Sequence, residues 1–193
     1  MPILFALLGF LLQTPQPAPL LQPAPGNPVV VIETSAGTIV AELYKDRAPV
    51  STENFLQYAR DGHYAGTIWH RVVSGYVIQG GGYTPELVER GSRPPIQNEA
   101  TNGLSNRRGT LAMARLRSAR SATSQFYINV ANNASLDHRG LGPDDFGYAV
   151  FGRVLEGMDI VDKIAAVRTT TKDGMDDVPV TPVLIKSVTV RRE

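Results

Sequence analysis

Short runs of β-branched and aromatic residues recur through most of the chain, and they limit the folds open to it more than any other feature. The segment VVVIETSAGTIVAELY (29–44) contains two such runs on either side of a Ser-Ala-Gly turn, which predicts a β-hairpin. Loops rich in Gly, Asn, Pro and Arg separate the later runs. Further strands are predicted at 67–73, 76–79, 109–114, 125–130, 148–154 and 183–190.

Two shorter segments have helical character. Ser51 or Thr52 is suited to cap a helix with apolar residues around Phe55, and Gly62 would end it. A second helix is predicted at 158–166. Many short strands, two short helices and no internal repeat predict a mainly β fold, with a closed sheet and helices at its ends.

The first 28 residues differ in composition from the rest. They contain seven of the 14 prolines and none of the 37 Asp, Glu, Lys and Arg residues. An apolar run at 3–12 has the length of a signal-peptide hydrophobic region and is short for a membrane-spanning helix. We therefore expect a signal or anchor segment with a proline-rich linker at 1–27 and a folded domain at 28–193, in a protein that is exported to the periplasm or tethered to a membrane facing outwards. The alternative is a cytoplasmic protein with a disordered tail.

Composition and motifs exclude several classes of chemistry. A net charge of +1 does not indicate a nucleic-acid or anionic-membrane binder, and without cysteine there is no disulfide, thiolate nucleophile or cysteine metal site. The three histidines lack metal-ligand spacing, and no G-x-S-x-G motif is present. The glycines at 80–82 indicate a backbone bend rather than a phosphate loop. The arginines within 107–120 indicate a solvated loop rather than an RNA site, because no aromatic residues alternate with them.

A group of polar and apolar residues on the predicted strands remains. Trp69 and Phe126 are expected in the core, and His70 is expected to be a hydrogen-bonded structural histidine rather than a base. Alternation along the strand places Arg71 on the face opposite His70. A concave site with this arginine, two glutamines and apolar side chains could bind a peptide. It has no activated nucleophile or metal with which to hydrolyse one.

Four segments follow one another in a fixed order: WHRVVSGYVIQGGG (69–82), NEATNGLSNRRGTLAMAR (98–115), SATSQFYINV (121–130) and FGYAVFGRV (146–154). Together they resemble the cyclophilin-type peptidyl-prolyl cis/trans isomerases, in particular the bacterial, periplasmic-like branch. The resemblance extends from about Val29 to the C-terminus. It implies a closed eight-stranded antiparallel β-barrel capped by two α-helices, an active groove on its outer face, and no cofactor or metal.

The resemblance also implies a role for individual residues. It assigns catalysis to Arg71, and it places the floor of a proline pocket at Tyr127 and Leu136. Tyr148 falls at the edge of that pocket. The complete set of substrate contacts that it implies is Tyr76, Val77, Gln79, Ala114, Arg115, Gln125, Tyr127, Leu136 and Tyr148.

Six positions depart from the residues of the best-known family members. Tyr76 and Tyr127 replace Phe, which would bring hydroxyl groups to or near the rim of the pocket. Ser135 stands where a large aromatic residue is frequent, so we expect weak cyclosporin binding at most. The other three departures are Val77 for Met, Arg115 for Asn and Tyr148 for His.

We therefore expect a monomeric folding enzyme that isomerises Xaa–Pro bonds of unfolded or partly folded polypeptides and does not act on nucleic acid. The alternative is a proline-peptide binding module or holdase chaperone on the same fold with little turnover. A third hypothesis, an RNA-associated protein, would rest on the arginines of 107–120. The presence of Arg71 with Gln79 and Gln125 favours the enzyme. Because arginine stays charged, the isomerase activity of the enzyme should vary little between about pH 6 and 8.

Overall fold

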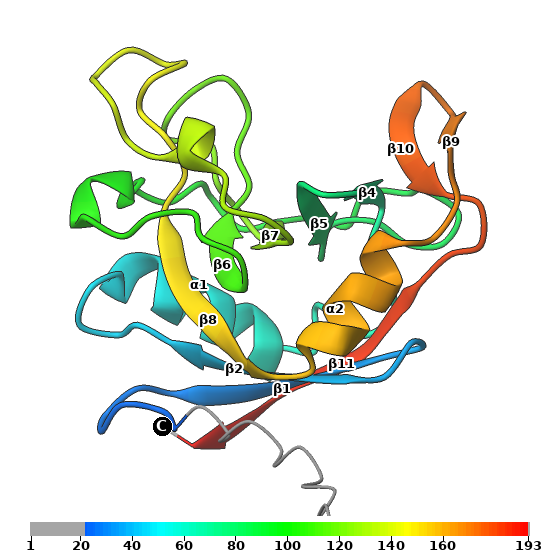
Figure 1. The fold of residues 1–193 in the computed structure, drawn as a ribbon, viewed down its shortest axis with the longest axis horizontal. Coiled ribbons are helices and arrows are strands. Elements are labelled where there is room, and N and C mark those ends of the chain that lie inside the picture. The colour runs from blue at the N-terminus through cyan, green and yellow to red at the C-terminus, as the bar shows by residue number, and fades with distance from the viewer. Residues whose placement is uncertain (1–21, 193) are drawn as a thin grey trace, which may run out of the picture.

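The strands form one strongly curled antiparallel sheet and a separate hairpin. The computed structural model describes residues 22–192 (Figure 1). Nine strands follow the order β3-β11-β1-β2-β8-β6-β7-β5-β4, and every neighbouring pair is antiparallel. Their bounds are β1 Val29–Thr34, β2 Thr38–Leu43, β3 Thr67–Ile68, β4 Arg71–Val73, β5 Val77–Gly80, β6 Thr110–Met113, β7 Phe126–Asn129, β8 Val150–Glu156 and β11 Leu184–Arg192.

The mainly β architecture and the first hairpin are confirmed, but the sheet is a half-barrel of nine strands rather than a closed barrel of eight. The additional strand arises because the predicted strand 67–73 is interrupted at Trp69 and His70. β3 pairs with β11 at one end of the sheet, and β4 pairs with β5 at the other. Two residues therefore connect the two ends of the sheet, and this short connection maintains its curl.

Helix α1 (Pro49–Arg60) begins earlier than predicted because a distant residue caps it. The Glu99 carboxylate accepts hydrogen bonds from the backbone N of Val50 and Ser51 at 3.0 and 2.8 Å, and from Ser51 Oγ at 2.7 Å. The helix dipole also favours a negative charge at this end. A cap by the side chain of Ser51 or Thr52 is therefore wrong. Gly62 follows the helix as expected, with φ at +69°.

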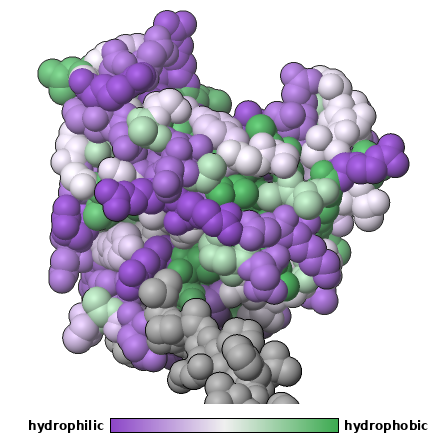
Figure 2. All heavy atoms as spheres, in the orientation of Figure 1, coloured by the Kyte–Doolittle hydropathy of each residue, from purple (hydrophilic) through white to green (hydrophobic). Residues whose placement is uncertain are grey.

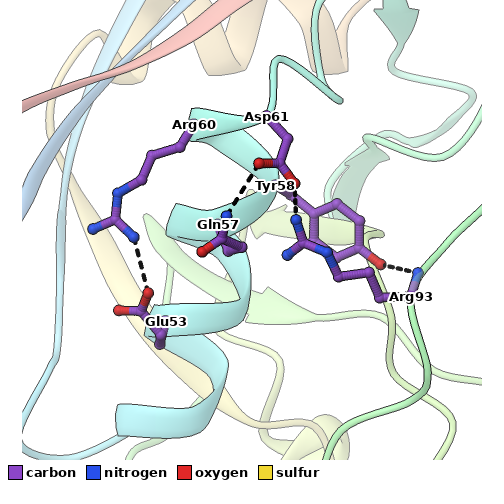
Figure 3. A network of polar contacts seen from close by, with 6 residues as sticks. All are labelled: Glu53, Gln57, Tyr58, Arg60, Asp61 and Arg93. Atoms are coloured by element: carbon purple, nitrogen blue, oxygen red, sulfur yellow. Dashed lines mark hydrogen bonds and ion pairs between the residues drawn. The ribbon is translucent and has the colours of Figure 1, made fainter.

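The C-terminal half of α1 contacts the loop 83–97 (Figure 3). The backbone N of Arg93 donates to the Tyr58 hydroxyl at 2.7 Å, and the Arg93 guanidinium lies 4.8 Å from the centre of that ring. Arg93 also forms an ion pair with Asp61. Two more contacts lie along the helix: Gln57 Nε2 donates to Asp61 Oδ1 at 3.0 Å, and on the side away from Arg93, Arg60 Nη1 donates to Glu53 Oε1 at 2.8 Å.

The remaining elements lie between and beyond these strands. α2 (Met158–Ala165) confirms the second predicted helix, and two short 3₁₀ helices, η1 (Ala100–Asn102) and η2 (Ala134–Leu136), lie in the loops. A hairpin of β9 (Thr169–Lys172) and β10 (Met175–Pro179) is absent from the prediction. In Figure 1 this hairpin stands apart at the upper right, in orange.

The end of the proline-rich segment contacts the folded domain. The backbone N of Ala24 donates to Oε2 of the buried Glu42 at 2.8 Å, and Arg153 Nε donates to Oε1 of the same carboxylate at 2.9 Å. The backbone N of Leu43 donates to the Pro28 carbonyl at 2.9 Å. The predicted boundary between 27 and 28 remains a prediction. The apolar run 3–12 lies outside the described residues.

The two faces of the sheet bury different residues. The inner face meets α1 in a core of aromatic rings, in which Phe126 lies 5.1 Å from Phe55 and 5.4 Å from Trp69. Trp69 and Phe126 are fully buried, which confirms their predicted core positions. A second apolar cluster lies on the opposite side of β5, β6 and β7, and it consists of Val77, Ala112, Ala114, Tyr127 and Val150.

Candidate active site

A cavity of about 280 Å³, the first cavity, opens over this second cluster. Figure 2 shows a hollow between the loops around η2 and the β9–β10 hairpin, with apolar residues in green beneath it. Gln125 lines an adjoining second cavity of about 290 Å³, which shares Gln79, Ala114 and Arg115 with the first. The first cavity is lined by the other nine predicted site residues, which are Arg71, Tyr76, Val77, Gln79, Ala114, Arg115, Tyr127, Leu136 and Tyr148.

The floor of the first cavity is apolar. Val77 of β5 and Tyr127 of β7 are almost fully buried, and the rings of Tyr127 and Tyr148 meet edge to face at 5.8 Å. The Tyr127 hydroxyl donates a buried hydrogen bond to Asn106 Oδ1 at 2.7 Å, and burial raises the pKa of Tyr127 well above its usual value of 10. The expectation of a rim hydroxyl is therefore wrong for Tyr127, because its oxygen is bonded inside the protein.

The polar side of the first cavity comes from the edge of the sheet. Arg71 of β4 and Gln79 of β5 are cross-strand partners, so their side chains lie next to each other on one face. Gln79 Nε2 donates to Gln125 Oε1 at 3.1 Å. Arg71 Nε lies 3.5 Å from Asp177 Oδ2. A guanidinium and two hydrogen-bonded amides thus stand beside the apolar floor.

Because Gly82 has no side chain, the side chain of Gln125 can lie directly against its backbone. A Cβ atom on Gly82 would lie 2.5 Å from Gln125 Cγ and 2.8 Å from its Nε2. Gly81 has φ at +86°, in the left-handed region that glycine adopts most easily. The bend predicted for the three glycines is confirmed, and it makes room for one of the two site glutamines.

Arg115 lines the first cavity, and its side chain contacts the surrounding loops. Its guanidinium lies 4.5 Å from the centre of the Tyr148 ring. Its Nε and Nη2 donate to the carbonyls of Gly147 and Pro143, both at 2.9 Å, and its Nη1 donates to the carbonyls of Leu116 and Arg117, both at 3.1 Å. The side chain of Arg115 therefore joins the loops 115–121 and 138–147.

Comparison with known proteins shows the family of this chain. Residues 29–190 match the family described as cyclophilin type peptidyl-prolyl cis-trans isomerase/CLD. The chain belongs to this family. It is 54% identical over 161 residues to the peptidyl-prolyl cis-trans isomerase cyp18 of Streptomyces antibioticus, covering 83% of this chain and 97% of that protein. It is 48% identical over 162 residues to peptidyl-prolyl cis-trans isomerase B of Escherichia coli, covering 84% of this chain and 99% of that protein.

A solved structure extends the comparison of this cyclophilin to its fold. The crystal structure of a Cryptosporidium parvum cyclophilin type isomerase, obtained in the presence of the dipeptide Ala-Pro, superposes with a TM-score of 0.73. The match covers 86% of this chain and 99% of that one, at 24% sequence identity. At this identity the likeness supports the cyclophilin fold alone.

His70 is not suited to act as a base in this cyclophilin. Its side chain is buried, its ring centre lies 4.6 Å from that of Tyr83, and its Nδ1 has no hydrogen-bond partner within residues 22–192. Burial, aided by the charge of Arg71, lowers the pKa of His70 from 6.5 to about 4. The ring is therefore uncharged at neutral pH, in accord with a structural role.

Most of the arginines within 107–120 are engaged. Arg108 donates two hydrogen bonds to the Asp162 carboxylate at 2.8 and 2.7 Å. Arg117 lies 3.6 Å from Asp144, and Arg115 binds four carbonyls as described above. These contacts agree with loops held at the protein surface, as predicted.

Sequence reasoning missed an amide network beneath the floor. Asn106 and Asn129 are almost fully buried, and Asn129 Nδ2 donates to Asn106 Oδ1 at 3.2 Å. Asn133 Nδ2 donates to Asn129 Oδ1 at 2.7 Å and to the Tyr76 carbonyl at 2.9 Å. The backbone N of Asn106 donates to Asp137 Oδ1 at 2.6 Å. The network holds η2, and with it Leu136, against β7. The sequence signal for this network was the asparagines in the loops before β6 and after β7, which include Asn106 and Asn133.

Proposed function

We propose that the first cavity binds the proline of an Xaa–Pro peptide and that Arg71 accelerates rotation about the amide bond before it. The observation that carries this proposal is the position of a half-exposed guanidinium at the edge of an apolar floor. The rotation barrier is about 18–20 kcal/mol because the C–N bond has partial double-bond character. Lowering it requires no covalent chemistry, only contacts that are stronger in the twisted amide than in the planar one.

The floor holds one side of the rotating bond. Val77, Tyr127 and Leu136 offer a proline ring apolar surface, and the buried hydrogen bond of Tyr127 keeps this surface in one conformation. Gln79 and Gln125 are hydrogen-bonded to each other beside the floor, where they can bind the flanking peptide. With the ring fixed, rotation occurs on the side of the residue before proline.

Arg71 then stabilises the twisted state. When the amide twists, the carbonyl is decoupled from nitrogen, and the prolyl nitrogen becomes a better hydrogen-bond acceptor. A charged donor held beside it forms a stronger bond than a neutral donor would, especially where part of the water has been displaced. The guanidinium also stays charged throughout the working pH range. This residue therefore supplies the contact that distinguishes the transition state.

The substrates that we propose are proline-containing segments of unfolded or partly folded polypeptides, on which the enzyme acts as a monomer. Relatives at 48–54% identity are named as isomerases, which favours an enzyme with turnover rather than a holdase. The Ala-Pro dipeptide named with the Cryptosporidium protein supports this chemical class of ligand. Ser135 is exposed on η2 and adds no aromatic surface to the groove, in accord with weak cyclosporin binding at most.

Exchange NMR on an Ala-Pro peptide tests the proposal directly. The full chain at substoichiometric concentration should accelerate cis/trans exchange, and Arg71→Ala should reduce kcat/KM about a hundredfold, as for loss of one oriented donor. Arg107→Ala is the matched control, because it removes one exposed cation outside the cavity and should leave the rate unchanged. Circular dichroism verifies that each variant is folded. Peptide binding without acceleration by the wild type would contradict the enzyme and favour the holdase.

We further propose that the protein is exported. Within residues 22–192, no helix has both the length and the apolar character needed to cross a bilayer. The proposal is supported by the apolar run 3–12 and the uncharged, proline-rich segment that follows it. Mass spectrometry of the protein from fractionated cells tests it. We expect to find the protein in the cell envelope, either without the run 3–12 or anchored there by it. A full-length chain in the cytoplasm would contradict export.

A further inference from the structure

The catalytic arginine lies on the last strand of the sheet, where the backbone has a sheet neighbour on one side only. β4 is three residues long and pairs with β5, which places Gln79 beside Arg71. The β9–β10 hairpin covers the other side, with β10 packed against β4. From β10, the carboxylate of Asp177 approaches to 3.5 Å between its Oδ2 and Arg71 Nε. This carboxylate forms an ion pair with the guanidinium.

The backbone of Asp177 is in an unusual conformation. Its φ is +61°, and it lies where the register of β10 shifts between Met175 and Val178. A left-handed conformation is uncommon for residues other than glycine, although Asp and Asn tolerate it better than most. A bulge of this kind redirects a side chain. The chain thus keeps a carboxylate at a position where glycine would fit with less strain, and this carboxylate faces Arg71.

We infer that Asp177 is a positioning residue for Arg71. The ion pair holds the Nε edge of the guanidinium and leaves Nη1 and Nη2 for the substrate. No residue of the described chain, 22–192, forms a hydrogen bond with either of these nitrogens. A long side chain on an edge strand has many rotamers, and fixing one of them before substrate binds lowers the entropy cost of reaching the transition state. The inference rests on the proposed function, because it assigns Asp177 to the step in which Arg71 acts.

The expected effect is moderate and falls on turnover. Both side chains are about 40% exposed, at 40% for Arg71 and 39% for Asp177, so the pair is partly screened by water. Exposed pairs of this kind correspond to about a two- to fivefold change in an equilibrium or rate. We expect this loss in kcat, with KM nearly unchanged, because Asp177 does not line the apolar floor.

Three variants separate positioning from structure. Asp177→Asn keeps the shape and the tolerance for positive φ but removes the charge. Asp177→Gly removes the side chain and relieves the backbone strain, so its melting temperature should not fall although its kcat does. Asp176→Asn is the matched control. It removes a carboxylate one residue away that is exposed and accepts a hydrogen bond from Thr171 Oγ1 at 2.7 Å, and it should retain wild-type activity.

The measurements are steady-state exchange rates and the NMR resonance of the Arg71 Nε–H group in the full chain. Both Asp177 variants should lose about two- to fivefold in kcat, and the Nε–H resonance should shift or broaden. In an Arg71→Ala background, Asp177→Asn should have no further effect. Wild-type kcat in Asp177→Asn, or an equal loss in the Arg71→Ala background, would overturn the inference. An inactive wild type would instead refute the proposed function, so the two failures are distinguishable.

Discussion

The hydrogen bond between Gln79 and Gln125 can be tested without altering either glutamine, by the substitution Gly82→Ala. The added Cβ would lie 2.5 Å from Gln125 Cγ, about 1 Å inside an ordinary carbon–carbon contact. Gly82 does not have a positive φ, so alanine meets no backbone strain. The amide of Gln125 must therefore move away, and the 3.1 Å hydrogen bond to Gln79 breaks.

The magnitude follows from what is lost. A neutral hydrogen bond contributes about 0.5–1.5 kcal/mol, which corresponds to about a two- to tenfold decrease in kcat/KM if the bond orients the peptide in the transition state. Stability should change little, because Gln125 is flexible and half-buried, and because alanine lowers the entropy of the unfolded chain by about 0.4–1 kcal/mol.

The prediction is tested by measuring kcat/KM from peptide exchange and the melting temperature on the same preparations. Gly91→Ala is the matched control, since a Cβ there meets no atom within 4 Å, and it should leave both quantities unchanged. In a Gln125→Ala background, Gly82→Ala should have no further effect on kcat/KM. Wild-type activity in Gly82→Ala would refute the reasoning, because it would show that the glutamine pair does not orient the substrate.

Three further predictions concern stability and pH. Tyr127→Phe should lower the free energy of unfolding by about 1 kcal/mol in urea titrations and leave kcat/KM unchanged, because the hydroxyl binds Asn106 inside the protein. Glu99→Ala should cost about 1–2 kcal/mol in the same assay, because α1 loses its cap. The lowered pKa of His70, about 4, means that its stabilising effect is complete above pH 6.5 and is lost as pH falls from 6.5 to 4, since only the unfolded chain binds the proton there. The free energy of unfolding should fall less steeply over this range in His70→Gln than in the wild type, and equal slopes would contradict the assignment.

Alternation along the strand predicted that Arg71 and Val73 share one face and that Val72 lies on the other, and the burial of β4 agrees with this. On β4, Val72 is buried while Arg71 and Val73 are partly exposed, as the period of two requires. The same rule separates Ile78, in the main core, from Val77 in the second cluster. Alternation of side chains is a local property of a strand, so these two assignments need no knowledge of the strand order.

Long-range features could not be predicted in the same way. The cap of α1 comes from Glu99, which lies 48 residues after Ser51 in the chain. The interruption at Trp69 and His70 depends on which strands lie at the two ends of the sheet. Ala114, Arg115, Leu136 and Tyr148 were identified as site residues through the family resemblance, because strand pairing and loop contacts bring them to the first cavity.

The unpredicted hairpin is the element that reaches Arg71, the arginine to which we assign catalysis. All four residues of β9 are exposed, so no apolar pattern marks the strand, although Asp173 and Gly174, both with positive φ, form the kind of turn typical of hairpins. Hydrophobic patterning reports on residues that stabilise the fold. In this hairpin only the end of β10, at Val178 and Pro179, is buried, so this signal is weak there. A side chain on a short edge strand needs such support most, and for this reason we assign the support of Arg71 to an element that its apolar pattern does not reveal.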